Sequence, residues 1–394
     1  MPTPTILELT EYQLQTFPKD TLPEEIGQLI WKKYAKQIDL EFPSPKTGGQ
    51  WQLKPKGWVG QIPLTPNLQL FIRPKVPLKQ LLGMLDYAYQ LRSFHWLDGL
   101  VNCETLPELY DRLARLLCDR ILTRKRQGFY RTYLPQTQTL SYLRGRLNLR
   151  KTLEKPWQTQ LHCHYETHTS DIPSNQILLW TVFLIARSGI CQPATTTKLR
   201  QAYHALHNIA TLTPCTVQDC TTPTYNRLNQ DYQPLHALCR FFLANLTPSH
   251  LQGKQTTVPF LVDMARLYEQ FVANWLSVHL PPQYSLKTQE HITLQDNTFN
   301  LDMVICDRAT QQAICVLDTK YKTPQQAANA DIYQINFYAH LKHCQQAILV
   351  YPHPLPQPLQ ITLQNVHIRN VTFSLNRDLN LTGQEFLNHC LSTP

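Results

Sequence analysis

Apolar residues recur at helical spacing in separated stretches of the first 250 residues. This pattern predicts helices over residues 24–38, 78–91, 107–126, 175–187, 199–212 and 235–246. Ser174 is the expected N-cap of the helix over 175–187, and the helix over 107–126 is expected to end near Gly128. Short apolar runs at 58–62 and 68–72 flank a turn at Pro66 and predict two strands, and the loosely alternating residues 129–148 are consistent with a hairpin.

The hydrophobic period changes near residue 260. A long helix is predicted over 260–280, ended by Pro281 and Pro282. Apolar runs then predict strands at 284–288, 299–306, 313–320 and 347–351, with a helix over 324–344 between the last two. This order predicts an α/β (α+β) fold whose C-terminal part has a central mixed sheet flanked by helices.

Composition places the chain among globular proteins and excludes two kinds of nucleotide site. Charged residues make up 16% and hydrophobic residues 42% of the 394 residues, enough for two or three domains with their own cores. The chain has few glycines and contains neither G-x-G-x-x-G nor G-x-x-x-x-G-K-[ST]. We therefore expect no nucleotide-binding motif in this chain.

The sequence also predicts no membrane association and a reducing compartment. Its longest apolar stretch, residues 177–186, is about half of the ~20 residues that span a bilayer, and no secretory signal is visible. The 11 cysteines are odd in number and lie mostly in apolar segments, which is typical of reduced thiols in a core. A cytoplasmic location is expected.

The positive charge of the chain is concentrated in one stretch. The formal net charge is +9, whereas residues 112–155 alone hold twelve basic and two acidic residues, an excess of ten. Such a stretch is the footprint of a polyanion or an acidic partner, or else a solvated helix face. The candidate partner or DNA contacts are Arg124, Lys125, Arg126, Arg144 and Arg146.

Two carboxylates and a lysine stand near the ends of two apolar strands. If Asp307 pairs with Ala313 across the intervening turn, Asp302 faces Asp318 directly and Lys320 lies on the same face as Asp318. Facing carboxylates repel each other unless a cation compensates them. Their hard oxygen atoms suit Mg²⁺, which can activate water and stabilise a phosphoryl transition state.

A lysine beside such a metal has a chemical use of its own. Lys320 can orient the attacking water or neutralise the charge of the pentavalent phosphate. The alternative is that Asp302 and Asp318 lie in solvent at strand ends, with Lys320 as their ion-pair partner. The apolar flanks and the hairpin spacing favour the metal site.

Asp302 with Asp318-Thr319-Lys320 resembles the PD-(D/E)xK nuclease core. The following segments are similar to the McrC family, the nuclease subunit of McrBC-type 5-methylcytosine-dependent restriction systems: Lys320-Tyr321-Lys322, Asp331-Ile332-Tyr333-Gln334, Tyr338-Ala339 and Leu349-Val350-Tyr351-Pro352. Segments at 71–75, 84–87, 144–146, 263–264 and 267–271 extend the resemblance over about residues 57–352. Leu301 departs from the family by replacing the proline usual before the first aspartate.

The resemblance implies roles for individual residues. Asp302 and Asp318 would be metal ligands, and Lys320 the catalytic lysine. Glu269, on the leading helix, would be an additional acidic ligand. Gln334 and Tyr338 share one helix face and are similar to the Q-x-x-x-Y element of RecB-like nucleases, which lies near metal and DNA.

The resemblance also implies partners and a domain plan. The chain would cut double-stranded, methylated DNA and would stimulate a separate McrB-like AAA+ GTPase subunit. The implied domains are 1–160 for docking on that subunit, 161–255 as a helical segment and 256–394 as the nuclease; residues 1–56 and 355–394 have no assigned role. Two alternatives remain: an adaptor without nuclease activity that activates a GTPase, and a stand-alone RecB-like nuclease.

Overall fold

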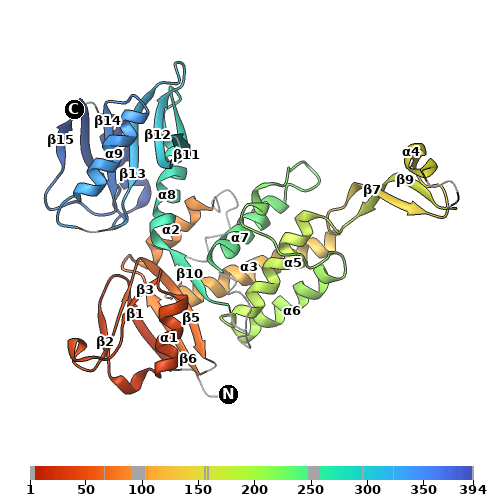
Figure 1. The fold of residues 1–394 in the computed structure, drawn as a ribbon, viewed down its shortest axis with the longest axis horizontal. Coiled ribbons are helices and arrows are strands. Elements are labelled where there is room, and N and C mark those ends of the chain that lie inside the picture. The colour runs from red at the N-terminus through yellow and green to blue at the C-terminus, as the bar shows by residue number, and fades with distance from the viewer. Residues whose placement is uncertain are drawn as a thin grey trace. The chain divides into compact units, whose positions relative to one another are not determined.

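The computed structural model describes residues 5–65, 67–89, 103, 105–154, 157, 159–246, 258–294, 297–322 and 324–392. The chain divides into two compact units (Figure 1). Unit 1 combines Met1–Leu109 with Pro259–Pro394, and unit 2 is the intervening segment Tyr110–Val258. Unit 2 is therefore an insertion in the sequence of unit 1. The functional division at residues 160 and 255 stays a prediction.

The N-terminal part of unit 1 contains two small sheets. The four-stranded sheet has the order β1 (Thr5–Thr10), β6 (Leu68–Arg73), β5 (Trp58–Thr65) and β10 (Phe260–Asp263), with β1 and β6 parallel. The antiparallel three-stranded sheet has the order β2 (Gln15–Phe17), β4 (Trp51–Pro55) and β3 (Ile38–Glu41). The described residues of this part also form the helices α1 (Glu24–Lys33) and α2 (Leu78–Ala88) and short 3-10 turns at Lys19–Thr21 and Pro45–Thr47. Both strands predicted around Pro66 and the helix predicted from residue 78 are confirmed, although residues 90 and 91 lie outside the described residues. The helix predicted over 24–38 ends earlier, at Lys33, and Ile38 begins β3.

The helix predicted over 260–280 begins too early. Its first four residues form β10, which pairs with β5, and α8 (Met264–His279) begins only after Asp263. The side chain of Asp263 accepts hydrogen bonds from the amides of Ala265 and Arg266 and so caps the helix. Because the apolar run is buried in both the strand and the helix, its periodicity alone could not separate them.

The C-terminal part of unit 1 is a six-stranded mixed sheet. Its order is β11 (Tyr284–Leu294), β12 (Asn297–Asp307), β13 (Ala313–Thr319), β14 (Gln346–Tyr351), β16 (Val366–Thr372) and β15 (Gln360–Leu363). The β13–β14 and β14–β16 pairs are parallel, and the others are antiparallel. Helix α9 (Asn329–Leu341) packs on β13, β14 and β16, while α8 packs on β11–β13 and α10 (Leu379–Leu391) on β16. The predicted mixed sheet flanked by helices is confirmed.

Buried side chains fill both faces of this sheet. Val304 and Val316 share one apolar cluster with Ile335 of α9. The alternating residues Met303 and Leu317 point to the opposite face and are also fully buried. There α8 and α10 join through an aromatic cluster, Trp275, Phe373 and Phe386. The strand ends that carry the predicted site are thus fixed by two cores.

Unit 2 is a group of helices with a β-ribbon that extends away from them (Figure 1). Its helices are α3 (Leu106–Gln127), which begins in unit 1, α5 (Pro173–Ser188), α6 (Pro193–His207) and α7 (Tyr232–Asn245), with a 3-10 turn at Asp219–Thr221. The ribbon has the order β7 (Thr132–Leu140), β9 (Leu161–Thr169) and β8 (Arg146–Leu147), with α4 (Leu149–Leu153) at its far end. The helices predicted between residues 175 and 246 are present, whereas the first residues of the segment 161–255, expected to be helical, form β9.

Three local predictions in unit 2 are wrong. Residues 129–148 do not form a hairpin, because β7 and β8 each pair with β9 instead of with each other. Ser174 lies inside α5, whose N-cap is Ile172. Helix α6 begins at Pro193, earlier than predicted. In both helices a proline occupies the first turn, where its fixed φ favours helix initiation.

The cysteines and the apolar segments bear on two further expectations, a reduced core and the absence of a membrane span. Nine of the eleven cysteines are buried and all eleven are free thiols, as expected for core residues. In the described part of the chain, no helix is both long enough and apolar enough to cross a bilayer.

Candidate active site

The hairpin of β12 and β13 brings two carboxylates together. Met303 pairs with Leu317, and the same register continued by one residue places Asp302 opposite Asp318. This is the register predicted from the sequence. Leu301 and Met303 beside Asp302 are buried, as is Leu317 before Asp318. Thr319, which follows Asp318, is only half-buried, so β13 leaves the apolar core here.

The turn of this hairpin differs from the prediction. Ala313 pairs with Cys306 rather than with Asp307, and the register shifts between Ile305 and Cys306, where Ile314 of β13 is the additional residue. The Asp307 carboxylate accepts hydrogen bonds from the amides of Ala309 and Thr310 and so stabilises the turn, while the Asp307 backbone amide donates to the carbonyl of Gln312. This bulge offsets the one-residue change in pairing at the turn, so Asp302 and Asp318 still face each other.

Asp302 is held by the end of the neighbouring strand. Its Oδ2 accepts hydrogen bonds from the backbone amide of Thr319 at 2.9 Å and from the Thr319 hydroxyl at 3.0 Å. These bonds fix the orientation of one carboxylate oxygen. Sequence reasoning gave Thr319 no role, because the contact depends on the strand pairing.

Asp318 and Lys320 form an ion pair inside the protein. Asp318 is 2% exposed, and the Lys320 Nζ lies 2.6 Å from its Oδ2. Burial and the nearby Asp302 raise the pKa of Asp318 to about 6. Burial lowers the pKa of Lys320, but Asp318 and Asp331 outweigh it and raise this pKa above its ordinary value. Lys320 is therefore a cation that compensates Asp318.

Helix α9 presents further polar groups to Lys320. The Oε1 of Gln334 accepts a hydrogen bond from Nζ of Lys320 at 3.1 Å, and the Gln334 amide donates to the Tyr338 hydroxyl at 2.9 Å. Asp331, three residues before Gln334, lies 3.8 Å from Lys320 and 2.5 Å from the Nζ of Lys322. The structure thus brings Lys320, Gln334 and Tyr338 together, and it adds Asp331, to which the sequence analysis assigned no role.

Glu269 reaches the same region from α8. Burial, followed by the charge of Asp302, raises the pKa of Glu269 to about 7, and Asp318 contributes in the same direction. The side-chain amide of Gln289 donates a hydrogen bond to Glu269 at 3.4 Å. Glu269 therefore lies within electrostatic range of both aspartates.

Gln289 has an unusual backbone conformation for a strand residue. Its φ is +48°, in the left-handed region, although the residues on both sides of it keep the ladder with β12. It occupies the position across from Asp302 in that ladder. Sequence reasoning missed Gln289, because glutamine is not a residue type that signals a left-handed conformation.

The chemistry of these side chains fits a hard divalent cation. Asp302, Asp318 and Glu269 offer carboxylate oxygens. Burial, and then the charge of Asp302, raise the pKa values of Asp318 and Glu269, and a bound cation would favour their charged forms. Within the described ranges, however, no three His, Cys, Asp or Glu side chains are already arranged to hold a metal ion. In this arrangement the ammonium of Lys320 supplies the compensating charge at Asp318.

The predicted basic contacts of α3 have different surroundings. Arg124 is largely buried within unit 2, where it lies 3.2 Å from Asp231 and over the ring of Tyr232. It therefore has a structural role in this unit. Lys125 and Arg126 are exposed.

Arg144 and Arg146 flank a tight turn in the ribbon. Gly145 between them has φ +68°, and a Cβ there would lie 2.4 Å from the carbonyl oxygen of His164, so the turn requires glycine. Both arginines are exposed, and Arg144 stacks on the ring of Tyr165 at 4.0 Å. The turn presents two cationic side chains to solvent.

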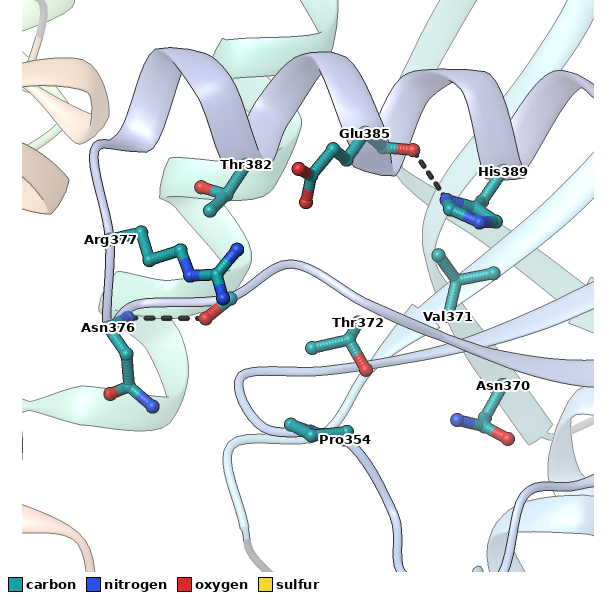
Figure 2. A pocket seen from close by; sticks show the side chains of 10 residues that line it. Pro354, Asn370, Val371, Thr372, Asn376, Arg377, Thr382, Glu385 and His389 are labelled. Carbon is teal, nitrogen blue, oxygen red and sulfur yellow. Dashed lines mark hydrogen bonds between the residues drawn. The ribbon is translucent and has the colours of Figure 1, made fainter.

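A cavity of about 510 Å³ lies beside α10 (Figure 2). Thr382, Glu385 and His389 from one face of the helix form one wall, and Asn370 and Thr372 of β16 lie across from them. The Nδ1 of His389 is hydrogen-bonded to the backbone carbonyl of Glu385, and no residue of the predicted site lines the cavity. The candidate active site is the hairpin end with α8 and α9.

Comparison with known proteins identifies the family. Residues 53–352 match the family described as McrBC 5-methylcytosine restriction system component. This chain belongs to that family. The McrBC match confirms the resemblance seen in the sequence.

Two similar proteins support the McrBC assignment. The Type IV methyl-directed restriction enzyme EcoKMcrBC of Escherichia coli (strain K12) is 22% identical over 270 residues, which cover 63% of this chain and 74% of that protein. In fold, the chain is similar to one from the refined half-complex of the tetradecameric assembly of Thermococcus gammatolerans McrB AAA+ hexamers with bound McrC. The TM-score is 0.57 at 18% identity, covering 98% of this chain and 100% of the other.

Proposed function

We propose that this chain is the DNA endonuclease subunit of a McrBC-type, modification-dependent restriction system in the cytoplasm. It hydrolyses phosphodiester bonds with Mg²⁺ in double-stranded DNA that carries 5-methylcytosine. The observation that carries the proposal is the facing pair Asp302 and Asp318 with Lys320 beside it, in a chain of the McrBC family.

Each side chain of the site has a part in this mechanism. Asp302, oriented by Thr319, and Asp318 would hold the metal, with Glu269 as a third carboxylate. The chemistry that Mg²⁺ would supply there is that of a Lewis acid, which polarises a phosphate and activates water. Lys320 would contribute the positive charge that stabilises the phosphoryl transition state or orients the water. Gln334 holds the lysine ammonium, and Tyr338 in turn orients the Gln334 amide.

A partner subunit follows from the same proposal. The solved relative is an assembly with McrB AAA+ hexamers, and the present chain lacks a phosphate-binding loop of its own. We propose an AAA+ GTPase partner, whose GTP hydrolysis this chain stimulates. Its docking surface is the far end of the ribbon, where Arg144 and Arg146 lie near exposed apolar side chains, namely Tyr142, Leu143, Leu149, Leu153 and Trp157.

A plasmid cleavage assay with methylated DNA and Mg²⁺ tests the proposal, run with and without the partner and GTP. We expect cleavage by wild type with both, and a loss of about 10³-fold or more for Asp318→Ala, because the metal and the lysine both depend on that carboxylate. Asp39→Ala removes an exposed carboxylate of the same unit and is expected to leave cleavage unchanged.

The two alternatives give different results in the same assay. Full stimulation of the GTPase without any cleavage by wild type would identify an adaptor. Cleavage without the partner and without GTP would identify a stand-alone nuclease. Cleavage that survives Asp318→Ala would contradict the site itself.

A further inference from the structure

Lys320 lies between two buried acids on different elements. Its Nζ is 2.6 Å from Oδ2 of Asp318 on β13 and 3.8 Å from Oδ1 of Asp331 on α9. The side-chain carbonyl of Gln334 accepts a hydrogen bond from the same Nζ at 3.1 Å. Only 17% of the lysine side chain is exposed, so these three groups are its main polar partners.

The present position of Lys320 conflicts with a cation at Asp318. A divalent ion bound by a carboxylate oxygen lies ~2.1 Å from it for Mg²⁺, and the ammonium already occupies the space beside Oδ2. Two cations on one carboxylate oxygen repel each other strongly in a buried site. A cation that binds through Oδ2 therefore requires Lys320 to leave this oxygen.

Asp331 is positioned to form an ion pair with the Lys320 ammonium once it leaves Asp318. Its other oxygen, Oδ2, is held at 2.5 Å by Lys322, which fixes the carboxylate while Oδ1 faces Lys320. Asp331 also lies in the first turn of α9, where the helix dipole favours a negative charge. A shift of about 1 Å brings Nζ to the ~2.8 Å of a direct charge-assisted bond, and Gln334 can hold the lysine at both positions.

Building on the proposed function, we propose that Asp331 is a positioning residue that takes over Lys320 when a divalent cation binds Asp318. In the absence of the cation, the Lys320 ammonium forms an ion pair with Asp318. In its presence, Lys320 pairs with Asp331 and Gln334 and stays beside the metal. The ion pair of Asp331 with Lys322 keeps the receiving carboxylate in place.

This exchange makes Lys320 a competitor of the cation, with a measurable consequence. Removing the lysine strengthens cation binding, whereas removing Asp331 weakens it, because Lys320 then has no alternative acid. The effect of Asp331 must disappear once Lys320 is gone, since it acts only through that lysine.

Isothermal titration calorimetry of the full-length chain with Mg²⁺ alone tests these relations. We expect Lys320→Met to tighten Mg²⁺ binding about 10-fold, Asp331→Asn to weaken it about 5-fold, and the double variant to match Lys320→Met. Arg266→Gln removes a cation that acts on Glu269 without touching Asp318 and serves as the control for general charge.

Three outcomes would overturn the exchange. If Arg266→Gln and Lys320→Met increased the Mg²⁺ affinity equally, general charge repulsion would explain the result without an exchange of Lys320. If Asp331→Asn also lowered the Mg²⁺ affinity in the Lys320→Met background, Asp331 would act on the cation directly and not through Lys320. Mg²⁺ affinities that stay the same in all variants, while Asp318→Asn abolishes binding to wild type, would overturn the exchange but not the proposed metal site. Absence of any Asp318-dependent Mg²⁺ binding would instead contradict the proposed function.

A second variant keeps the test valid if Asp331→Asn does not fold. Lys322→Met keeps the Asp331 carboxylate but removes the ion pair that fixes it, so Asp331 receives Lys320 less readily. We expect about 3-fold weaker Mg²⁺ binding, which is opposite to the effect of removing a repelling cation, and no such loss in the Lys320→Met background. Unchanged or tighter binding by Lys322→Met would contradict the exchange.

Discussion

Gln289 holds a left-handed backbone conformation across from Asp302 in the ladder of β11 and β12. A non-glycine residue in this region costs about 1–3 kcal/mol, and such strain persists where the surrounding structure fixes it. Here the side-chain amide reaches Glu269, one of the three carboxylates of the candidate site. The strained backbone and the amide contact together indicate that Gln289 orients Glu269.

Replacing Gln289 with glycine separates these two effects. Glycine accepts φ +48° without strain but has no amide, so Gln289→Gly is expected to raise the free energy of unfolding by about 1 kcal/mol and to slow DNA cleavage about 10-fold. Urea unfolding and cleavage rates measure the two effects. Gln311→Gly is the matched control: its φ is +59° in the exposed hairpin turn, so it should gain stability with unchanged cleavage. Equal effects of both variants on cleavage would contradict a role for the amide.

Glu11 makes the stability of unit 1 depend on pH. It is fully buried, and burial raises its pKa from 4.5 to about 7, despite favourable contacts with the Lys75 amide and the Tyr321 hydroxyl. Because the folded pKa lies above the unfolded one, this group stabilises the fold below pH 4.5, and that contribution is lost as the pH rises through 7.

Glu11→Gln removes this titration. Relative to wild type, we expect the variant to gain about 2–3 kcal/mol in the free energy of unfolding between pH 4.5 and pH 8, measured by urea unfolding. Glu8→Gln in β1, three residues before Glu11, is the control and should show no such trend, because Glu8 is half exposed and paired with Arg73. A pH-independent difference between Glu11→Gln and wild type would contradict the assignment.

Among the elements, β10 depends on one glycine of its neighbour. Gly60 in β5 has φ +140°, and a Cβ there would lie 2.1 Å from the carbonyl oxygen of Phe260. The contact is to backbone, so it cannot be relieved by rotating a side chain. β10 can therefore approach β5 only where no side chain is present.

Gly60→Ala is expected to lower the free energy of unfolding by about 3 kcal/mol or more, because both the conformation and the contact oppose a Cβ. Gly48→Ala is the matched control: Gly48 has φ +62° but open space around it, so only the conformational cost of about 1 kcal/mol applies. Thermal and urea unfolding of both variants measure the difference. Equal losses would show that the approach of β10 is not the limiting contact.

The elements also show what a sequence can and cannot predict. β12, β13, β14 and α9 were predictable, because apolar runs bounded by polar turns determine them locally, and the register of the facing Asp302 and Asp318 followed from the hairpin. β10 and the partner of β7 were not, since strand pairing between distant segments leaves no local pattern. For the same reason the contacts of Thr319, Asp331 and Gln289 had no sequence signal: each acts on a residue of another element.

In the whole molecule, unit 1 is held together by segments from both ends of the chain. Leu261 packs in the N-terminal core, and the Tyr12 hydroxyl donates to the carbonyl of Tyr321, directly after the site lysine. The side chain of Gln80 donates to the carbonyl of Arg377, and Tyr87 bonds Asn380. The six-stranded sheet is therefore expected to depend on the N-terminal segment for its stability.

A fragment of residues 259–394 tests this dependence. Alone, we expect it to unfold at lower urea concentration than unit 1 in the full chain, because it loses β5, Glu11 and the contacts of α2. Adding residues 1–109 as a separate chain is expected to restore the transition, which circular dichroism follows. A separate chain of residues 110–258 is the control and should have no effect. An unfolding midpoint of the isolated fragment equal to that in the full chain would contradict the dependence.

The pairing of β10 with β5 has a consequence for synthesis. When β5 leaves the ribosome, the strand that completes its sheet has not been made, and the whole of unit 2 must be translated first. At about 5–20 residues per second this interval lasts roughly 10–40 s, during which β5 presents an open sheet edge. A chain that stops before Phe260 never closes this edge and remains open to pairing with other chains. Completion of the N-terminal sheet therefore reports that the chain has been translated as far as the helix that carries Glu269.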